Sequence, residues 1–187
     1  RSTHTNAYLT GFGRTRRIVL FDTLVAGHPR REILAVLAHE LGHLRLGHIA
    51  KNLGLSAVFS VAAFFALSKI ITCNPLYEAF RIETLGPQGG LVIAAVLSRP
   101  LDLLLSPARA WLSRLQERQA DAYAHGLMGE SGPLVDALLG LARHNLVNLH
   151  PHPLYAWFFL THPRVIERIE DLERMDARQV AHGAGPA

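Results

Sequence analysis

The sequence contains a single cysteine, Cys73, so no disulfide can form within the chain and the fold does not depend on oxidation. Charged residues make up only 18% of the 187 positions. The basic ones are scattered and lack the clustered basic and aromatic pattern of a nucleic-acid-binding surface, so we expect no nucleic-acid partner. The sequence begins at Arg1, without a methionine or a signal-peptide pattern, and we expect a piece of a longer protein.

Apolar residues are abundant, at 49% of the sequence with a mean hydropathy of +0.17. Residues 53–72 form an apolar run with Lys69 as its sole charge, and a helix of that length would be about 30 Å long, the thickness of a hydrocarbon core. A second apolar stretch, residues 89–106, is interrupted by Arg99, Pro100 and Asp102. We interpret residues 53–106 as a transmembrane helical hairpin. The alternative is a buried helical pair in a soluble core.

Basic residues flank this pair of apolar stretches on its outer side, whereas the link between the stretches is mixed in charge. Cytoplasmic segments next to membrane helices are enriched in Lys and Arg. We therefore expect an integral, multi-pass membrane protein whose two outer parts face the cytoplasm. The membrane would be the bacterial inner membrane if the protein is bacterial and the endoplasmic reticulum if it is eukaryotic. The outer basic residues are Arg45, Lys51, Arg109, Arg114 and Arg118, and the link carries Glu78, Arg81 and Glu83.

The rest of the chain predicts a mainly α fold with a small β-hairpin or edge-strand element. Two short strand-like runs, NAYLTGF and RRIVLFDT, lie within the first 23 residues. Apolar residues recur at helical spacing from about Arg30 to Lys51. A polar helix is expected over 107–128, an amphipathic helix over 132–146, a loop rich in His, Pro and aromatic residues over 150–163, and a charged helix over 164–178.

The helix predicted over residues 30–51 carries the sequence HELGH at residues 39–43. Residues four apart project from the same face of a helix, so the imidazoles of His39 and His43 can hold one cation. Glu40 points about 100° away from His39 on a helix. It can miss the metal and still act as general base for a water that the metal activates, which is the arrangement of zinc proteases. The alternative is a helix with incidental histidines.

A third protein ligand has two candidates. His48 lies nine residues beyond His39, which on a continuous helix places it on the opposite face, so we expect a helix-surface residue there. Glu117 lies in LSRLQERQADAYA, residues 112–124, four residues before Asp121. Glu117 can complete a His-His-Glu zinc site with water in the fourth position, and Asp121 can accept the outer N–H of a ligating histidine. The alternative for this acidic pair is a solvated helix face.

These motifs together resemble the type I CAAX prenyl endopeptidases, which are membrane-embedded zinc proteases. The resemblance covers nearly the whole chain in order. It implies a gluzincin-like zinc metalloprotease core with a two-helix transmembrane hairpin between its ligand helices. Substrate-edge strands and the zinc helix would occupy residues 1–52, the hairpin 53–106, and the third-ligand helix with the C-terminal helical part 107–187. The resembling stretches are residues 4–25, 32–52, 112–124 and 161–172.

The resemblance also implies roles that the spacing alone does not give. His162, in an HPP-like motif, would stabilise the oxyanion of the tetrahedral intermediate or hold the substrate backbone. Asn6, Ala7 and Arg168 would bind substrate, the first two at an edge where a peptide adds as a strand. The expected partners are one zinc ion per chain, a peptide or protein substrate that in this family is prenylated at a C-terminal CAAX sequence, and the lipid bilayer. The catalytic part would face the cytoplasm.

Two other functions share these features. A membrane quality-control protease of the heat-shock type has the same HExxH motif and later glutamate. A catalytically idle membrane scaffold could keep the zinc site for structure alone.

Overall fold

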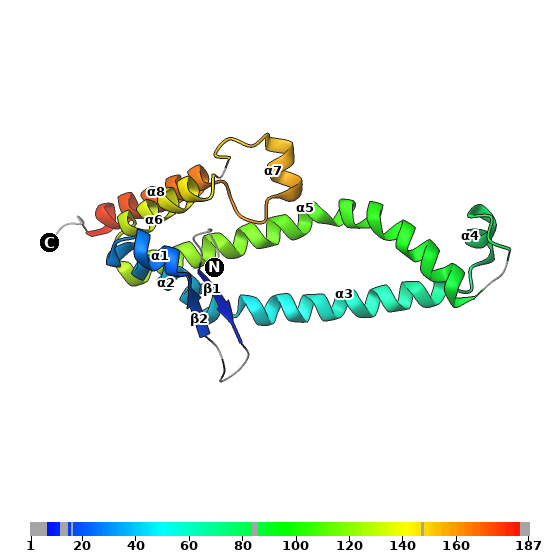
Figure 1. Ribbon diagram of the computed structural model, residues 1–187. Helices are drawn as coiled ribbons and strands as arrows, with labels where there is room; N and C mark the ends of the chain where they lie inside the picture. The colour runs from blue at the N-terminus through cyan, green and yellow to red at the C-terminus, as the bar shows by residue number, and fades with distance from the viewer. Residues whose placement is uncertain (1–6, 12–14, 16, 84–85, 147, 184–187) are drawn as a thin grey trace. The chain divides into compact units, whose positions relative to one another are not determined.

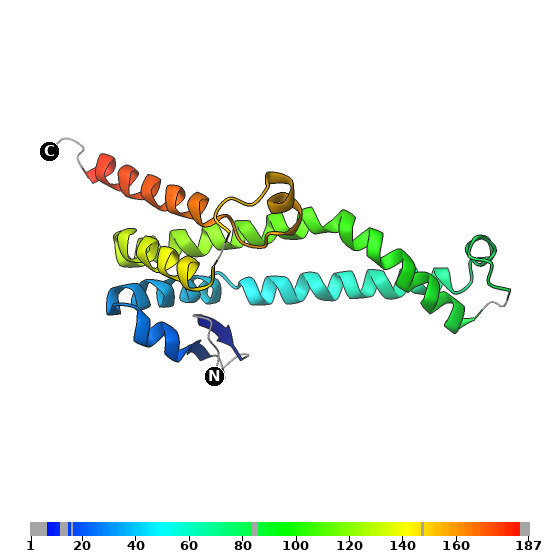
Figure 2. The same cartoon turned by 45° about the horizontal axis from the view of Figure 1, so that its top comes forward.

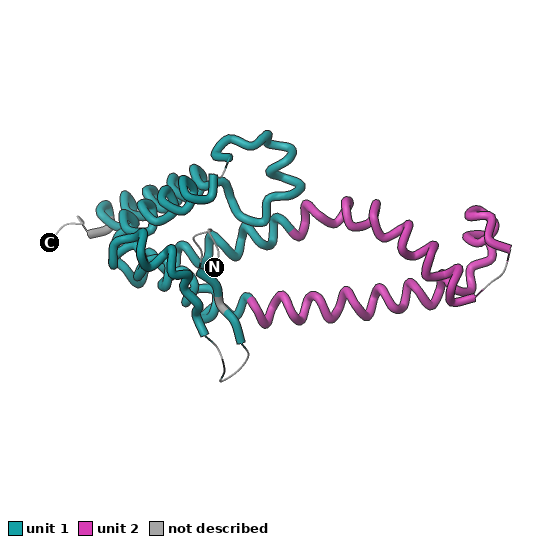
Figure 3. The backbone as a smooth tube through the Cα atoms, viewed as in Figure 1, with its two compact units in different colours: residues 1–48, 110–187 teal, residues 49–109 magenta. Residues whose placement is uncertain are grey.

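A computed structural model describes residues 7–11, 15, 17–83, 86–146 and 148–183 (Figure 1). The chain divides into two compact units, which Figure 3 distinguishes by colour. One contains residues 1–48 and 110–187, and the other contains residues 49–109. The predicted fold class is confirmed: the described residues are mainly helical, with one two-stranded sheet.

The unit of residues 49–109 consists of apolar helix and a short connection. It contains most of α3 (His48–Ile70), α4 (Asn74–Ala79) and the first half of α5 (Pro87–Met128). Both long helices are apolar and long enough to cross a membrane by length and composition, and their apolar windows are 0% and 6% buried within the protein. The start of α5 packs closely in this unit, because a β-carbon on Gly90 would lie 2.6 Å from Cγ1 of Ile71.

Helix α5 is continuous, whereas the sequence predicts a separate helix beginning after Pro107. Two prolines, Pro100 and Pro107, lie inside it. Proline has no N–H to donate to the carbonyl four residues earlier, so Pro107 deprives the Leu103 carbonyl of its usual donor. The Ser106 hydroxyl donates to this carbonyl at 2.8 Å. A side-chain donor of this kind lets an apolar helix continue through proline.

The other unit begins with the predicted hairpin. Strands β1 (Ala7–Thr10) and β2 (Arg17–Leu20) pair antiparallel, with Ala7 opposite Leu20. The short helix α1 (Asp22–Gly27) leads into α2 (Arg30–Arg45), and α6 (Gly132–His144), α7 (Pro153–Phe159) and α8 (Val165–Gly183) follow α5. The residues of α7 are predicted to be loop. Pro153 begins the helix, where its missing N–H costs nothing.

Small residues allow the helices of this unit to pack closely around α2. Helix α2 lies beside α6, as Figure 2 shows, and β1 also contacts α2. A first core cluster joins α2, α5, α6 and α8. A second joins α1, α2 and α6 with the strands β1 and β2. The buried members of the first cluster are Ala35, Ala38, Ala124, Leu134, Leu138 and Leu172, and those of the second are Leu24, Val36 and Ala137.

The predicted continuous helix from Arg30 to Lys51 is wrong at its C-terminal end. Helix α2 ends at Arg45 and α3 begins at His48. Gly47 between them has φ of +70°, a left-handed conformation that glycine adopts without strain and that commonly ends helices. The break redirects His48, which is 2% exposed, so its predicted position on the helix surface is wrong too.

Candidate metal centre

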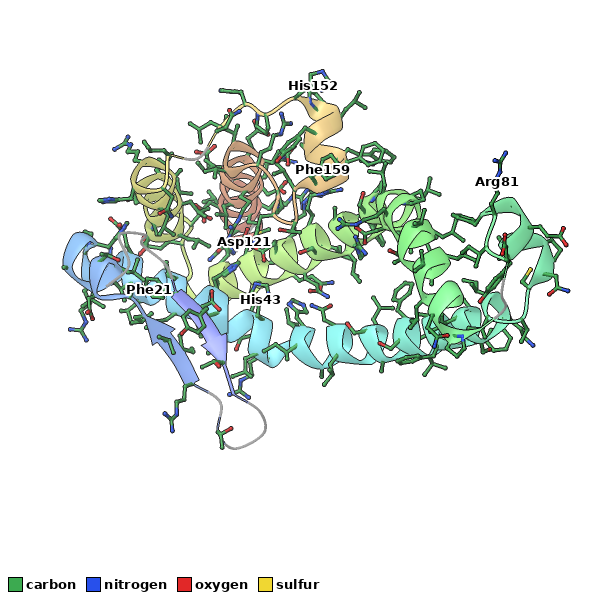
Figure 4. The ribbon with its side chains drawn as sticks, turned by 45° about the vertical axis from the view of Figure 1, so that its right-hand side comes forward. Phe21, His43, Arg81, Asp121, His152 and Phe159 are labelled. Carbon is green, nitrogen blue, oxygen red and sulfur yellow. The ribbon has the colours of Figure 1, made fainter. Side chains whose placement is uncertain are left out.

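Three residues from two helices come together in the unit of residues 1–48 and 110–187. His39 and His43 lie one turn apart on α2, Glu117 lies on α5, and one ligand atom of each is within 4.8 Å of the others. Nε2 of His43 is 3.3 Å from Glu117 Oε1, and Nε2 of His39 is 3.6 Å from Oε2. Figure 4 shows His43 and Asp121 on these neighbouring elements.

Close packing of α2 against α5 positions these ligand atoms. A β-carbon on Gly42 would lie 3.0 Å from Cα of Ala120 and 3.2 Å from Cβ of Tyr123. Gly42 precedes His43 and Ala120 precedes Asp121. The absence of a side chain at position 42 therefore lets the two backbones approach each other beside the candidate ligands.

Asp121 determines which nitrogen of His39 faces the other two ligands. Its Oδ1 is 2.8 Å from His39 Nδ1. An ionised carboxylate only accepts hydrogen bonds, so His39 Nδ1 donates, and the lone pair is left on Nε2. Asp121 is 2% exposed, and a buried carboxylate fixes both the tautomer and the orientation of the ring.

Arg168, in the first turns of α8, neutralises the buried Asp121. Its Nε donates to Asp121 Oδ2 at 2.8 Å and its Nη2 donates to Oδ1 at 2.6 Å. This two-bond geometry is the strongest that arginine forms with a carboxylate. Nη1 also lies 3.5 Å from Glu117 Oε2. A single buried guanidinium thus contacts both Glu117 and Asp121.

Glu40 is half-buried beside the cluster. Burial raises the pKa of its carboxyl above the ordinary value, although the neighbouring His39 and His43 oppose this effect. A carboxylate of raised pKa is a stronger proton acceptor, which suits a general base.

His162 reaches the cluster from the segment just before α8. Its Nδ1 lies 2.9 Å from Glu117 Oε2, and this hydrogen bond raises the pKa of the imidazole. Arg114, one turn before Glu117 on α5, donates to the carbonyl of Leu160 at 2.8 Å and to that of Ala156 at 3.2 Å. A cavity of about 220 Å³ lies beside this segment, and its lining includes Arg114, Trp157 and His162.

Of the residues expected at a substrate edge, Ala7 is in β1 and Asn6 lies outside the described residues. Ala7 packs against the core cluster of Leu24, Val36 and Ala137, which ties the strand to α2. His48 and Gln119 also lie near the centre, and the helical spacing does not predict this. Gly47 is the available signal in the sequence, because glycine often ends a helix.

The residues present fit a zinc ion. Two imidazoles and one carboxylate are the protein ligands of a familiar class of catalytic zinc sites, which leave a fourth position open. The two Nε2 atoms of His39 and His43 are 3.2 Å apart and face a buried carboxylate, where a cation would be favoured. In the described part of the chain, this is the one group of three such residues with the spacing for a metal.

The sequence matches the model of a metallopeptidase family. The family model of peptidase family M48 matches residues 1–176. The chain belongs to this family, which confirms the resemblance found in the sequence.

Individual relatives give a more specific comparison than the family model. The chain is 35% identical over 180 residues to the CAAX prenyl protease 1 homolog of Oryza sativa, covering 96% of this chain and 42% of that protein. It is 33% identical over 214 residues to the human CAAX prenyl protease 1 homolog, covering 94% and 45%. The crystal structure of S. mikatae Ste24p matches with a TM-score of 0.78 and 36% identity over 92% of this chain and 42% of that one. The chain thus spans less than half the length of these relatives.

Proposed function

We propose that this chain carries the catalytic centre of a zinc-dependent membrane endopeptidase of the CAAX prenyl protease type. The observation that supports it best is the meeting of Glu117 with His39 and His43, whose ligand atoms lie within 4.8 Å of one another. Glu40 follows the first histidine directly. We assign His39, His43 and Glu117 as ligands of one zinc ion per chain.

The bound zinc would supply Lewis acidity, which lowers the pKa of a water and polarises the scissile carbonyl. The chain's own residues do the rest. Glu40 accepts the proton of the attacking water on its carboxylate and passes it to the leaving amine. His162 donates a hydrogen bond to the developing oxyanion. Nδ1 of the same imidazole lies 2.9 Å from Glu117 Oε2, which keeps it beside the candidate centre.

Asp121 and Arg168 act through the ligands. Asp121 holds the His39 ring through Nδ1, which leaves Nε2 as the nitrogen that would bind zinc, and Arg168 neutralises Asp121 with two hydrogen bonds. The family resemblance also implies that Arg168 binds substrate. We expect a substrate peptide to lie as an added strand beside β1, near Asn6 and Ala7.

The two apolar helices would cross the lipid bilayer as a hairpin, with the catalytic part in the cytoplasm. Their nearly complete exposure supports this, because apolar windows only 0% and 6% buried within the protein need another apolar environment. The substrate would be a peptide or protein prenylated at a C-terminal CAAX sequence, as the names of the relatives indicate for those proteins.

The test is hydrolysis by the full-length protein in detergent. A farnesylated CAAX peptide, its unmodified counterpart and casein are compared with and without a zinc chelator. Chelator-sensitive cleavage of the farnesylated peptide alone is expected. Equal cleavage of casein would favour the quality-control function. Zinc binding without any peptidase activity would favour an idle scaffold.

A further inference from the structure

The second metal-ligand histidine has a hydrogen-bonded partner of its own, and it lies beyond the Gly47 break. His48, at the start of α3, is 2% exposed. Its Nδ1 is 2.9 Å from Nδ1 of His43. On the other side of the ring, its Nε2 is 3.1 Å from Oε1 of Gln119 on α5. The three side chains form a continuous hydrogen-bonded series from Gln119 on α5 to the candidate metal ligand His43.

The order of donors in this series is set by Gln119. An amide oxygen only accepts hydrogen bonds, so His48 Nε2 carries the proton that it donates. A neutral imidazole protonated on Nε2 has its lone pair on Nδ1. That lone pair accepts from His43 Nδ1, which must therefore carry a proton. His43 is then left with its lone pair on Nε2, the atom 3.3 Å from Glu117 Oε1.

We propose that His48 and Gln119 form a positioning relay that holds His43 in the tautomer and orientation required to bind zinc. The proposal rests on the proposed zinc site. Outer hydrogen-bond partners of this kind orient ligating histidines. If the amide of Gln119 were reversed, both hydrogen bonds would reverse, a proton would sit on His43 Nε2, and that nitrogen could not bind a metal.

The relay gives the two histidine ligands different supports. His39 donates to Asp121, a carboxylate held by Arg168, whereas His43 donates to the imidazole of His48, which the neutral amide of Gln119 holds. With the protons so placed, the Nε2 atoms of both histidines present lone pairs to one point, 3.2 Å apart. His48 is thus a positioning residue, and it does not need to contact the metal or the substrate.

The test is the zinc dissociation constant of the full-length protein in detergent, measured by competition with a chromogenic chelator. His48→Leu removes the acceptor for His43 and should weaken zinc binding about 10- to 100-fold. His48→Asn keeps an acceptor oxygen close to the Nδ1 position and should bind zinc within about threefold of the wild type. Absorption of the Co²⁺-loaded variants should show an altered d–d band for Leu and a normal one for Asn.

Three further variants separate the loss of the relay from a general loss of stability. Gln119→Leu changes only the exposed member of the relay, which is the one farthest from the metal centre, and leaves the core untouched. It should also weaken zinc binding. Gln119→Glu keeps an acceptor oxygen and should not weaken zinc binding. His28→Leu removes another buried histidine, whose Nδ1 pairs with Glu32 at 2.6 Å, and should leave the zinc constant unchanged. Melting temperatures of all variants report folding.

The outcomes distinguish the relay from the zinc site itself. Wild-type affinity in a folded His48→Leu variant would overturn the relay and leave the proposed function intact, as would a His48→Asn variant no better than Leu. Absence of zinc binding by the wild-type protein would overturn the proposed function together with the relay.

Discussion

The α-carbon of Ala120 lies only 3.0 Å from the position that a β-carbon on Gly42 would occupy. This contact brings the helix that carries His43 against the helix that carries Asp121. This approach is tighter than nine in ten real β-carbon contacts, so a side chain at position 42 requires α2 and α5 to move apart by a few tenths of an ångström.

Gly42→Ala should therefore destabilise the protein and weaken zinc binding together. Overpacking of this kind costs about 1–3 kcal/mol, and the melting temperature and the zinc dissociation constant measure the two effects. Gly126→Ala is the matched control, because Gly126 also lies inside a helix, α5, and its β-carbon would meet nothing within 4 Å. It should stabilise the helix by about 0.5–1 kcal/mol. Unchanged stability in Gly42→Ala would contradict the close packing.

Glu40→Gln should abolish peptidase activity while zinc still binds. The amide keeps the shape of the side chain but cannot accept a proton, and loss of a general base lowers turnover by about 10²- to 10⁴-fold. Metal analysis of the purified variant should give one zinc per chain, as in the wild type. Retained turnover would reject Glu40 as the base.

Glu117→Ala should instead empty the metal site. The substitution removes one of three protein ligands from a buried position, and two histidines alone hold zinc weakly. Glu170→Ala, which removes an exposed glutamate that pairs with Arg174 on α8, is the control and should keep full zinc content. If Glu117→Ala retains one zinc per chain, the third ligand lies elsewhere.

Arg168→Met should be strongly destabilising, because it leaves Asp121 buried without its cation. Breaking a buried ion pair in this way costs about 3–5 kcal/mol. Arg168→Lys should rescue only part of the loss, since a single ammonium cannot reproduce the two bonds of the guanidinium. Denaturant unfolding measures both variants. Full rescue by lysine would show that charge alone matters at this position.

Cys73 offers a test of membrane orientation. It is the single cysteine of these 187 residues and lies between α3 and α4, in the link of the proposed hairpin. With both outer parts in the cytoplasm, a membrane-impermeant maleimide should label Cys73 from the outside of intact cells. Cysteine introduced at Arg174 in a Cys73→Ser background should react only after permeabilisation. The reverse pattern would invert the topology.

The sequence predicted the parts of this protein that depend on local periodicity. The spacing of His39 and His43, and that of Glu117 and Asp121, are helical patterns, and the structure places the two pairs on facing helices. The apolar runs likewise became long exposed helices. These features are visible because each is encoded within a few turns of one helix.

Contacts between distant segments could not be predicted in the same way. The pairing of Arg168 with Asp121 joins residues 47 positions apart, and nothing in the periodicity of either helix selects that partner. The left-handed conformation of Gly47 was missed because glycine is also tolerated inside helices. A continuous helix through Gly47 predicts an exposed His48, whereas in the structure His48 is a buried neighbour of the site.

The anchoring of the Leu160 carbonyl by Arg114 affects how this chain can vary among species. Leu160 follows α7 and precedes His162 by two residues. Additions or deletions upstream of Pro153 would therefore change the length of the segment between α6 and α7 without shifting the imidazole of His162. Natural variation in length should therefore be tolerated before α7 and be rare between residues 160 and 162.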